Sequence, residues 1–147
     1  MSSPREAIHD AVRRRLGEHR LVYTSGRRSL VDVLLQIGRP VTVPEIRRRR
    51  TALTQSSVYR NLVGLERVGV VHKITADREH TCFEMHEDFI GHHHHLVCVR
   101  CGSIVDFRVP QAGERALDRM LSEAARSARF RIMDHRLDAV GVCAACR

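Results

Sequence analysis

Tryptophan is absent from this chain, and aromatic residues make up only 4% of its 147 residues. The hydrophobic core must therefore depend on Leu, Val, Ile and Ala. No apolar run approaches the roughly 20 residues that a membrane-spanning helix needs. The N-terminus lacks the apolar stretch of a signal peptide. We therefore expect a cytoplasmic protein with no membrane partner.

Lysine is almost missing as well, since Lys73 is the only one, yet the net charge is +8 because arginine is abundant. Such a basic balance suits a polyanionic partner, above all nucleic acid. Apolar residues at 43% and charged residues at 29% indicate a folded globular chain and not a disordered one.

The chain also lacks the signature of a zinc-dependent nucleobase deaminase, which is His-x-Glu followed by Pro-Cys-x-x-Cys. No His-x-Glu occurs, and valine precedes both Cys-x-x-Cys pairs. We therefore expect a binding protein and not an enzyme.

The N-terminal half predicts helices followed by a β-hairpin. Capping residues and apolar spacing place helices after Ser3, after Thr24, from Thr42 through Arg50, and from Thr54 to Gly69. Two strands, Val70–Ile74 and His80–Glu84, follow and are joined by a turn at Ala76–Arg78. This order predicts a winged helix-turn-helix, in which the third or fourth helix enters the DNA major groove.

The C-terminal half predicts a smaller α/β domain. Strands are expected at His92–Val99, Ser103–Phe107 and Phe130–Val142, with a helix at Gln111–Ser127. The fold class is therefore α+β, with a DNA-binding domain at residues 1–87 and a smaller α/β domain at residues 88–147.

Two Cys-x-x-Cys pairs, Cys98/Cys101 and Cys143/Cys146, bracket this second domain. Each pair presents two thiolates from one tight turn, and the two pairs together supply a tetrahedral Cys₄ zinc site. The alternative is a thiol redox switch, although reduced thiols in the cytoplasm more often bind metal than form disulfides. Cys82 stands outside the pattern and is expected to be a half-buried strand cysteine.

Four consecutive histidines, His92 to His95, precede the first cysteine pair. Because side chains alternate along a strand, His93 and His95 should face one way and His92 and His94 the other. Each pair can begin a different metal site, and imidazole alone does not choose the metal.

Other ligands must come from elsewhere in the sequence. For His93 and His95 the candidates lie on the first hairpin, where Glu84 and His86 share a strand face by spacing. For His92 and His94 the candidates lie on the helix and the last strand. The predicted regulatory site is His72, Glu84, His86, His93 and His95, and the additional site is His92, His94, Glu114 and His135.

These residues together resemble the ferric uptake regulator family. The matching stretches are Ser56–Leu62, Gly69–Ile74, Phe83–Glu84 and His92–Gly102, followed by His135 and the terminal Cys-x-x-Cys. The resemblance implies a homodimeric, metal-dependent repressor of metal-homeostasis genes, which binds an AT-rich palindromic operator in double-stranded DNA. In such a repressor, residues 88–147 would form the metal-binding dimerisation domain. The resemblance also implies that metal in the regulatory site favours the DNA-binding dimer.

The resemblance further implies roles for single residues. Cys98, Cys101, Cys143 and Cys146 would hold structural Zn²⁺, and Ser57, Tyr59 and Arg60 would contact DNA. Val22 stands where many members carry a DNA-contacting lysine, which leaves Arg20, Arg27 or Arg28 for that contact. Pro40 stands where iron-sensing members often carry a histidine ligand, so Zn²⁺ is the first expectation for the sensed metal, with Fe²⁺ second. A peroxide-sensing repressor of the same family is the alternative function.

Overall fold

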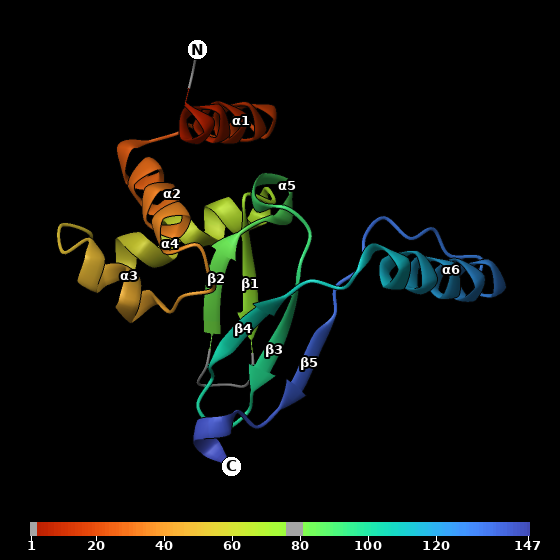
Figure 1. Ribbon diagram of the computed structural model, residues 1–147. Helices are drawn as coiled ribbons and strands as arrows, with labels where there is room; N and C mark the ends of the chain where they lie inside the picture. Colours follow the sequence, from red (N-terminus) through yellow and green to blue (C-terminus); the bar gives the residue numbers. More distant parts are fainter. Residues whose placement is uncertain (1–2, 76–80) are drawn as a thin grey trace. The chain divides into compact units, whose positions relative to one another are not determined.

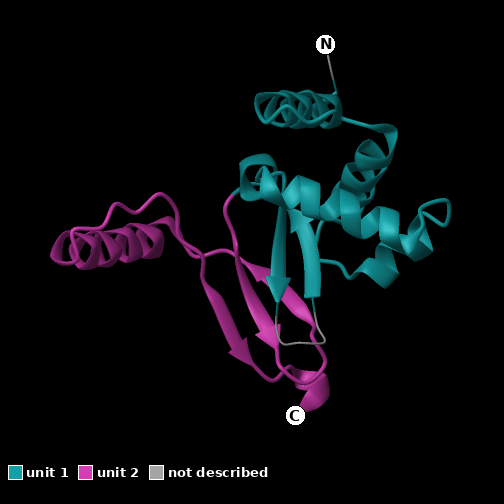
Figure 2. Ribbon diagram, turned by 180° about the vertical axis from the view of Figure 1, so that it is seen from behind, with its two compact units in different colours: residues 1–91 teal, residues 92–147 magenta. Residues whose placement is uncertain are grey.

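The computed structural model describes residues 3–75 and 81–147, which form parts of two compact units. The first unit is Met1–Gly91 and the second is His92–Arg147 (Figure 2). The division thus falls at Gly91, four residues after the boundary expected at residue 87. No helix in the described residues is long and apolar enough to cross a bilayer.

Side-chain caps begin the helices of the first unit where the sequence predicts them. Ser3, Thr24, Thr42 and Thr54 each accept a hydrogen bond from the backbone N–H three residues later. The helices are α1 (Pro4–Glu18), α2 (Ser25–Ile37), α3 (Val43–Arg49) and α4 (Gln55–Arg67), shown in Figure 1. Gly38 ends α2 with a φ of 66°, which an L side chain adopts only with strain.

A hairpin completes the winged helix-turn-helix. Strands β1 (Val71–Thr75) and β2 (Thr81–Met85) are antiparallel, and the predicted turn at 76–78 and His80 lie outside the described residues. Val41, just before α3, makes a backbone bridge to Phe83 of β2. The core is mostly aliphatic, as the scarcity of aromatic residues requires, and it includes Leu30, Ile46, Leu62 and Leu65 together with Phe83.

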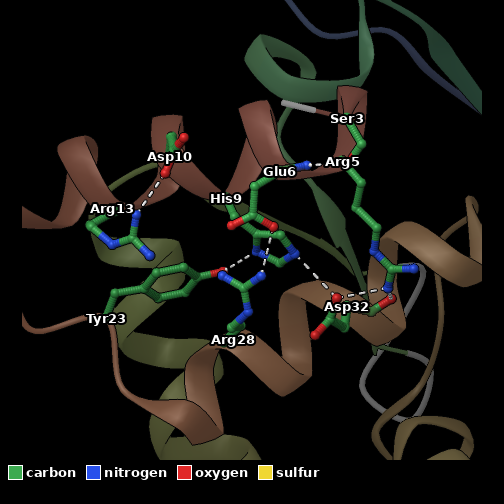
Figure 3. A network of polar contacts seen from close by, with 9 residues as sticks. All are labelled: Ser3, Arg5, Glu6, His9, Asp10, Arg13, Tyr23, Arg28 and Asp32. Atoms are coloured by element: carbon green, nitrogen blue, oxygen red, sulfur yellow. Dashed lines mark hydrogen bonds and ion pairs between the residues drawn. The ribbon is translucent and has the colours of Figure 1, made fainter. Parts of the chain in front are cut away.

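A buried polar network fastens α1 to α2, as Figure 3 shows. The His9 side chain is only 1% exposed, and its Nε2 lies 3.1 Å from Asp32 Oδ1, so Nε2–H donates to that carboxylate. Its Nδ1, 2.7 Å from the Tyr23 hydroxyl, then accepts from Tyr23. Burial raises the pKa of Tyr23, which keeps the hydroxyl protonated as a donor. Around this centre lie the ion pairs Arg5–Asp32 and Arg28–Glu6.

The second unit is a three-stranded sheet with one long helix. Strand order is β4 (Ile104–Phe107), β3 (His94–Cys98), β5 (Asp138–Gly141), with β4 antiparallel and β5 parallel to β3. Helix α6 (Gln111–Ser127) has the predicted bounds, and a short 3₁₀ turn, Ala144–Cys146, follows β5.

The structure differs from the sequence-based expectation at two elements, one in each unit. The strand expected from Phe130 to Val142 is only Asp138–Gly141, because only these four residues pair with β3 in the sheet. The helix α5 (Glu87–Ile90) was not predicted; its four residues are too few for an apolar period to mark them. His86 caps α5, which takes it beyond the end of β2, and His135 precedes β5.

We predict that Tyr23→Phe destabilises the chain by about 1–3 kcal/mol, because it leaves the buried Nδ1 of His9 without a donor. The matched control is Tyr59→Phe, since the Tyr59 side chain is 46% exposed on α4. That change should lower the free energy of unfolding by less than about 0.5 kcal/mol. Urea unfolding followed by far-ultraviolet circular dichroism measures both. Equal costs for the two variants would mean that the His9 network contributes nothing.

Candidate metal centres and DNA-binding surface

The four cysteines of the two Cys-x-x-Cys pairs converge at one end of the second unit. Their sulfurs lie within 4.8 Å of one another, and the Sγ atoms of Cys101 and Cys143 are 3.7 Å apart. A tetrahedral zinc ion with Zn–S bonds of about 2.3 Å separates its sulfurs by about 3.8 Å. Gly102, with a φ of 68°, permits the tight turn after the first pair. The geometry of this cluster therefore fits zinc.

The hydrogen bonds within the cluster shift the thiol pKa values in opposite directions. Backbone N–H groups of Cys143 and Cys101 lower the pKa of Cys98 to about 6, and the Cys143 N–H lies 3.3 Å from its sulfur. Hydrogen bonds with Cys143 and then Cys101 raise the pKa of Cys146 to about 12. Four adjacent thiolates repel one another, and a divalent cation at their centre would remove that repulsion. The donor set thus suits a cation.

The predicted additional site is also brought together. Nε2 of His94, a fully buried side chain, lies 2.8 Å from Glu114 Oε1. Glu114 Oε2 lies 3.6 Å from His92 Nε2 and 3.5 Å from His135 Nε2. The three imidazoles lower the pKa of Glu114, first through the hydrogen bond with His94, so the carboxylate is ionised. Three imidazoles and one carboxylate form a set that Zn²⁺ or Fe²⁺ accepts.

On the other face of β3, His93 and His95 lie next to each other, with ring centroids 5.0 Å apart. Asp106 of β4 pairs with His95 in the strand register, and its Oδ1 lies 3.9 Å from His95 Nε2. One ligand atom from each of His93, His95 and Asp106 lies within 4.8 Å of the others. The alternation expected for the histidine run is therefore present, and each face of β3 has its own cluster.

The other three residues of the predicted regulatory site belong to the first unit. His72 of β1 pairs with Glu84 of β2, whose buried carboxylate Oε1 lies 3.5 Å from His72 Nδ1. His86 is not on the β2 face as expected; its Nδ1 accepts a hydrogen bond from the Asp88 N–H at 3.3 Å. Because that bond uses the Nδ1 lone pair, the neutral ring carries its proton on Nε2, and His86 could bind a metal only after the capping bond is broken.

Sequence reasoning missed Asp106 and Asp138, which both flank His95. Asp138 Oδ1 lies 2.9 Å from His95 Nδ1. Asp106 could have been found from its place in a predicted strand that follows the histidine strand. Asp138 was harder to identify, because the sequence does not give the register of β5 against β3.

The exposed face of α4 carries the predicted DNA contacts. Ser56, Tyr59, Arg60 and Val63 line a shallow hollow on it. Tyr59 is 46% and Val63 60% exposed, so both side chains are accessible to a partner. Ser57 is half-buried and lies 3.5 Å from the Asn61 side-chain amide. An exposed aromatic beside an arginine, in the N-terminal half of the second helix of the motif, suits contacts to base edges and phosphates.

The other two predicted DNA contacts are engaged within the protein. Arg27 donates to the Val22 carbonyl and packs closely on Gly64 of α4, where a Cβ would lie 3.1 Å from its guanidinium. Arg28 donates to Glu6 at 2.9 Å, which raises the pKa of its guanidinium. Both residues therefore have structural partners of their own.

Comparisons with known proteins point to one family. The ferric uptake regulator family matches residues 18–140. The ferric uptake regulation protein of Legionella pneumophila is 32% identical over 92 residues, covering 63% of this chain and 62% of that protein. The peroxide-responsive repressor PerR of Staphylococcus epidermidis is 32% identical over 96 residues, covering 65% and 58%. The chain thus spans about three fifths of the length of these curated relatives.

The fold is shared with solved structures. The ferric uptake regulator of Helicobacter pylori, described as having three functional metal binding sites, aligns with a TM-score of 0.72 at 24% identity. The alignment covers 97% of this chain and 93% of that one.

We predict that Cys143→Ser lowers the bound zinc from about one ion per chain to almost none, because a structural site needs all four ligands. Cys82→Ser is the matched control: Cys82 is buried in β2, outside the cluster, and burial raises the pKa of its thiol. Zinc per chain, measured by atomic emission after dialysis, should be unchanged in the control. Full zinc in Cys143→Ser would contradict the Cys₄ assignment.

Proposed function

Because the chain belongs to the ferric uptake regulator family, we propose that it is a metal-responsive transcriptional repressor with no catalytic reaction of its own. It acts in the cytoplasm on metal-homeostasis genes. The observation that supports this proposal most directly is the pair of histidine–carboxylate clusters on opposite faces of β3, in a chain that also has an exposed helix suited to DNA.

Operator binding is assigned to α4 of two copies of the chain. Tyr59 and Arg60 contact base edges and phosphates in the major groove of an AT-rich palindrome, and Val63 lies on the same exposed face for apolar contact with thymine methyl groups. Arginine contacts with phosphates supply much of the affinity, which therefore falls as salt rises. Arg27 and Arg28 contribute less, because their guanidinium groups have partners within the protein.

We infer homodimerisation because the second unit buries few apolar side chains of its own. Among its described residues the only buried apolar side chains are Val97 and Cys98. Apolar side chains are instead exposed over its sheet, on α6 and beyond that helix, including Leu96, Val105, Met120, Phe130 and Val140. A unit this small needs further burial or metal to be stable, and a second copy supplies the burial. Closed two-fold symmetry also matches a palindromic operator.

Metal would act by binding the DNA-competent conformation better than the alternative, since equal affinity for both conformations shifts nothing. The Cys₄ cluster would hold structural Zn²⁺, and the clusters on the two faces of β3 would hold exchangeable metal. Zn²⁺ is proposed as the regulatory ion and Fe²⁺ as the second candidate. The proposal has a parallel in the three functional metal sites described for the Helicobacter pylori protein.

A peroxide-responsive repressor is the second candidate function. It is favoured by the 32% identity to PerR of Staphylococcus epidermidis, equal to that of the Legionella pneumophila regulator. In that case peroxide added with Fe²⁺ should place one oxygen atom on His93 or His95. Peptide mass spectrometry measures this, and unmodified histidines would exclude the peroxide mechanism.

We predict that metal strengthens operator binding about 5–150-fold, the usual range for allosteric coupling. Protein that keeps its Cys₄ zinc but has lost exchangeable metal is titrated against its own promoter by fluorescence anisotropy. Zn²⁺ and Fe²⁺ are added separately in metal buffers, and an unrelated duplex is the control. Operator affinity that is the same with chelator and with every metal would contradict metal gating.

We also predict that Arg60→Ala weakens operator binding about 10–100-fold and lowers discrimination against altered bases, because it removes a groove contact. Arg67→Ala is the matched control, since Arg67 is exposed in the last turn of the same helix. It should change affinity less than about threefold, the effect of one distant charge. If both variants weaken binding equally, only net charge matters and α4 does not read the operator.

A further inference from the structure

His95 lies between two carboxylates in one row of the sheet. The antiparallel register pairs it with Asp106 of β4, and the parallel register pairs it with Asp138 of β5. The His95 side chain is 4% exposed, whereas those of Asp106 and Asp138 are 34% and 38% exposed. A buried imidazole is thus held from both sides by strands that are far apart in the sequence.

The two carboxylates approach different nitrogens of the ring at different distances. Asp138 Oδ1 is 2.9 Å from Nδ1, which is a hydrogen bond, and a carboxylate requires that Nδ1–H be the donor. Asp106 Oδ1 is 3.9 Å from Nε2, too far for a hydrogen bond. That separation suits two ligands of one cation instead. The neutral ring therefore carries its proton on Nδ1 and directs the Nε2 lone pair toward Asp106.

Resting on the proposed function, we propose that Asp138 is a positioning residue for the regulatory metal. It fixes the tautomer and the orientation of His95, so that Nε2 is ready to bind the ion together with His93 and Asp106. The negative charge of Asp138 also makes Nε2 of His95 a stronger ligand for the metal, as carboxylates hydrogen-bonded to metal-bound histidines generally do. Asp138 is not itself a ligand, because its hydrogen-bonding oxygen lies on the Nδ1 side of the ring.

In the other cluster, the carboxylate nearest to Nδ1 of His135 lies farther away than Asp138 does from His95. There Asp118 Oδ1 lies 3.6 Å from His135 Nδ1, beyond hydrogen-bond distance. A backbone hydrogen bond also holds Asp138 beside His95. The backbone N–H of His95 donates to the carbonyl of Leu137, the residue before Asp138, at 3.2 Å. Strand β5 therefore fixes the carboxylate by its register and not by a flexible loop.

The test uses the full chain with its Cys₄ zinc, carrying His135→Ala so that the additional site does not compete. Asp138→Ala and the isosteric Asp138→Asn are compared with Glu123→Gln, an exposed change of the same charge on α6. The first readout is the tautomer of His95 in the absence of exchangeable metal, measured by long-range ¹H–¹⁵N NMR. The second is the dissociation constant of Co²⁺, measured by optical titration.

We expect Asp138→Ala to lose the exclusive Nδ1–H tautomer, because the other ring nitrogen is then free to take the proton. The Co²⁺ dissociation constant should rise about 10–100-fold. Asp138→Asn keeps an acceptor and should retain the tautomer with an intermediate affinity, while Glu123→Gln changes neither. Asp138→Asn also keeps the test valid if Asp138→Ala fails to retain zinc.

Two results would overturn the positioning role. One is an unchanged tautomer and Co²⁺ affinity in both Asp138 variants. The other is a loss of Co²⁺ binding in Asp138→Ala with the tautomer of that variant unchanged, which would make Asp138 a direct ligand. If the His135→Ala parent binds no Co²⁺, the regulatory metal site of the proposed function fails, and the positioning role fails with it. Co²⁺ binding that is indifferent to Asp138 removes the positioning role alone.

Discussion

Convergence of four cysteine sulfurs within 4.8 Å is the constraint on which the second unit depends. The first unit has a continuous aliphatic core, but the second buries hardly any apolar side chains among its described residues. Cys98 ends β3 and Cys143 follows β5, so a cation held between them would fasten the two parallel strands at one end. In this unit metal ligation would stabilise the fold in the way that hydrophobic burial stabilises the first unit.

The same strand, β3, serves both histidine clusters, and this sharing connects their chemistry. His93 and His95 face one cluster, while His92 and His94 face the other. A metal on either face would restrict the strand that the other site uses, so the two sites are expected to bind cooperatively if they favour one conformation. The carboxylates come from β4, β5 and α6, so that each neighbouring element of the unit contributes to a site.

Local sequence signals predicted the helices well, because capping and apolar period depend on residues close together in the chain. Thr54 and Ser3 cap the helices that they were expected to cap, and α6 has the predicted bounds. Signals that depend on distant partners predicted less. The length of β5 was wrong, since only β3 determines which residues of that stretch form a ladder. The carboxylates of Asp106 and Asp138 were missed for the same reason.

The sequence by itself determined the family, the winged helix-turn-helix, the two cysteine pairs and the division of the histidine run between two faces. Each of these follows from spacing within a short segment: three residues for a cysteine pair, two for a strand face. Only the tertiary structure decided that Asp106 and Asp138 lie against His95, and that Arg27 and Arg28 have partners within the protein. These arrangements depend on strand register and helix packing, which join residues that no local pattern connects.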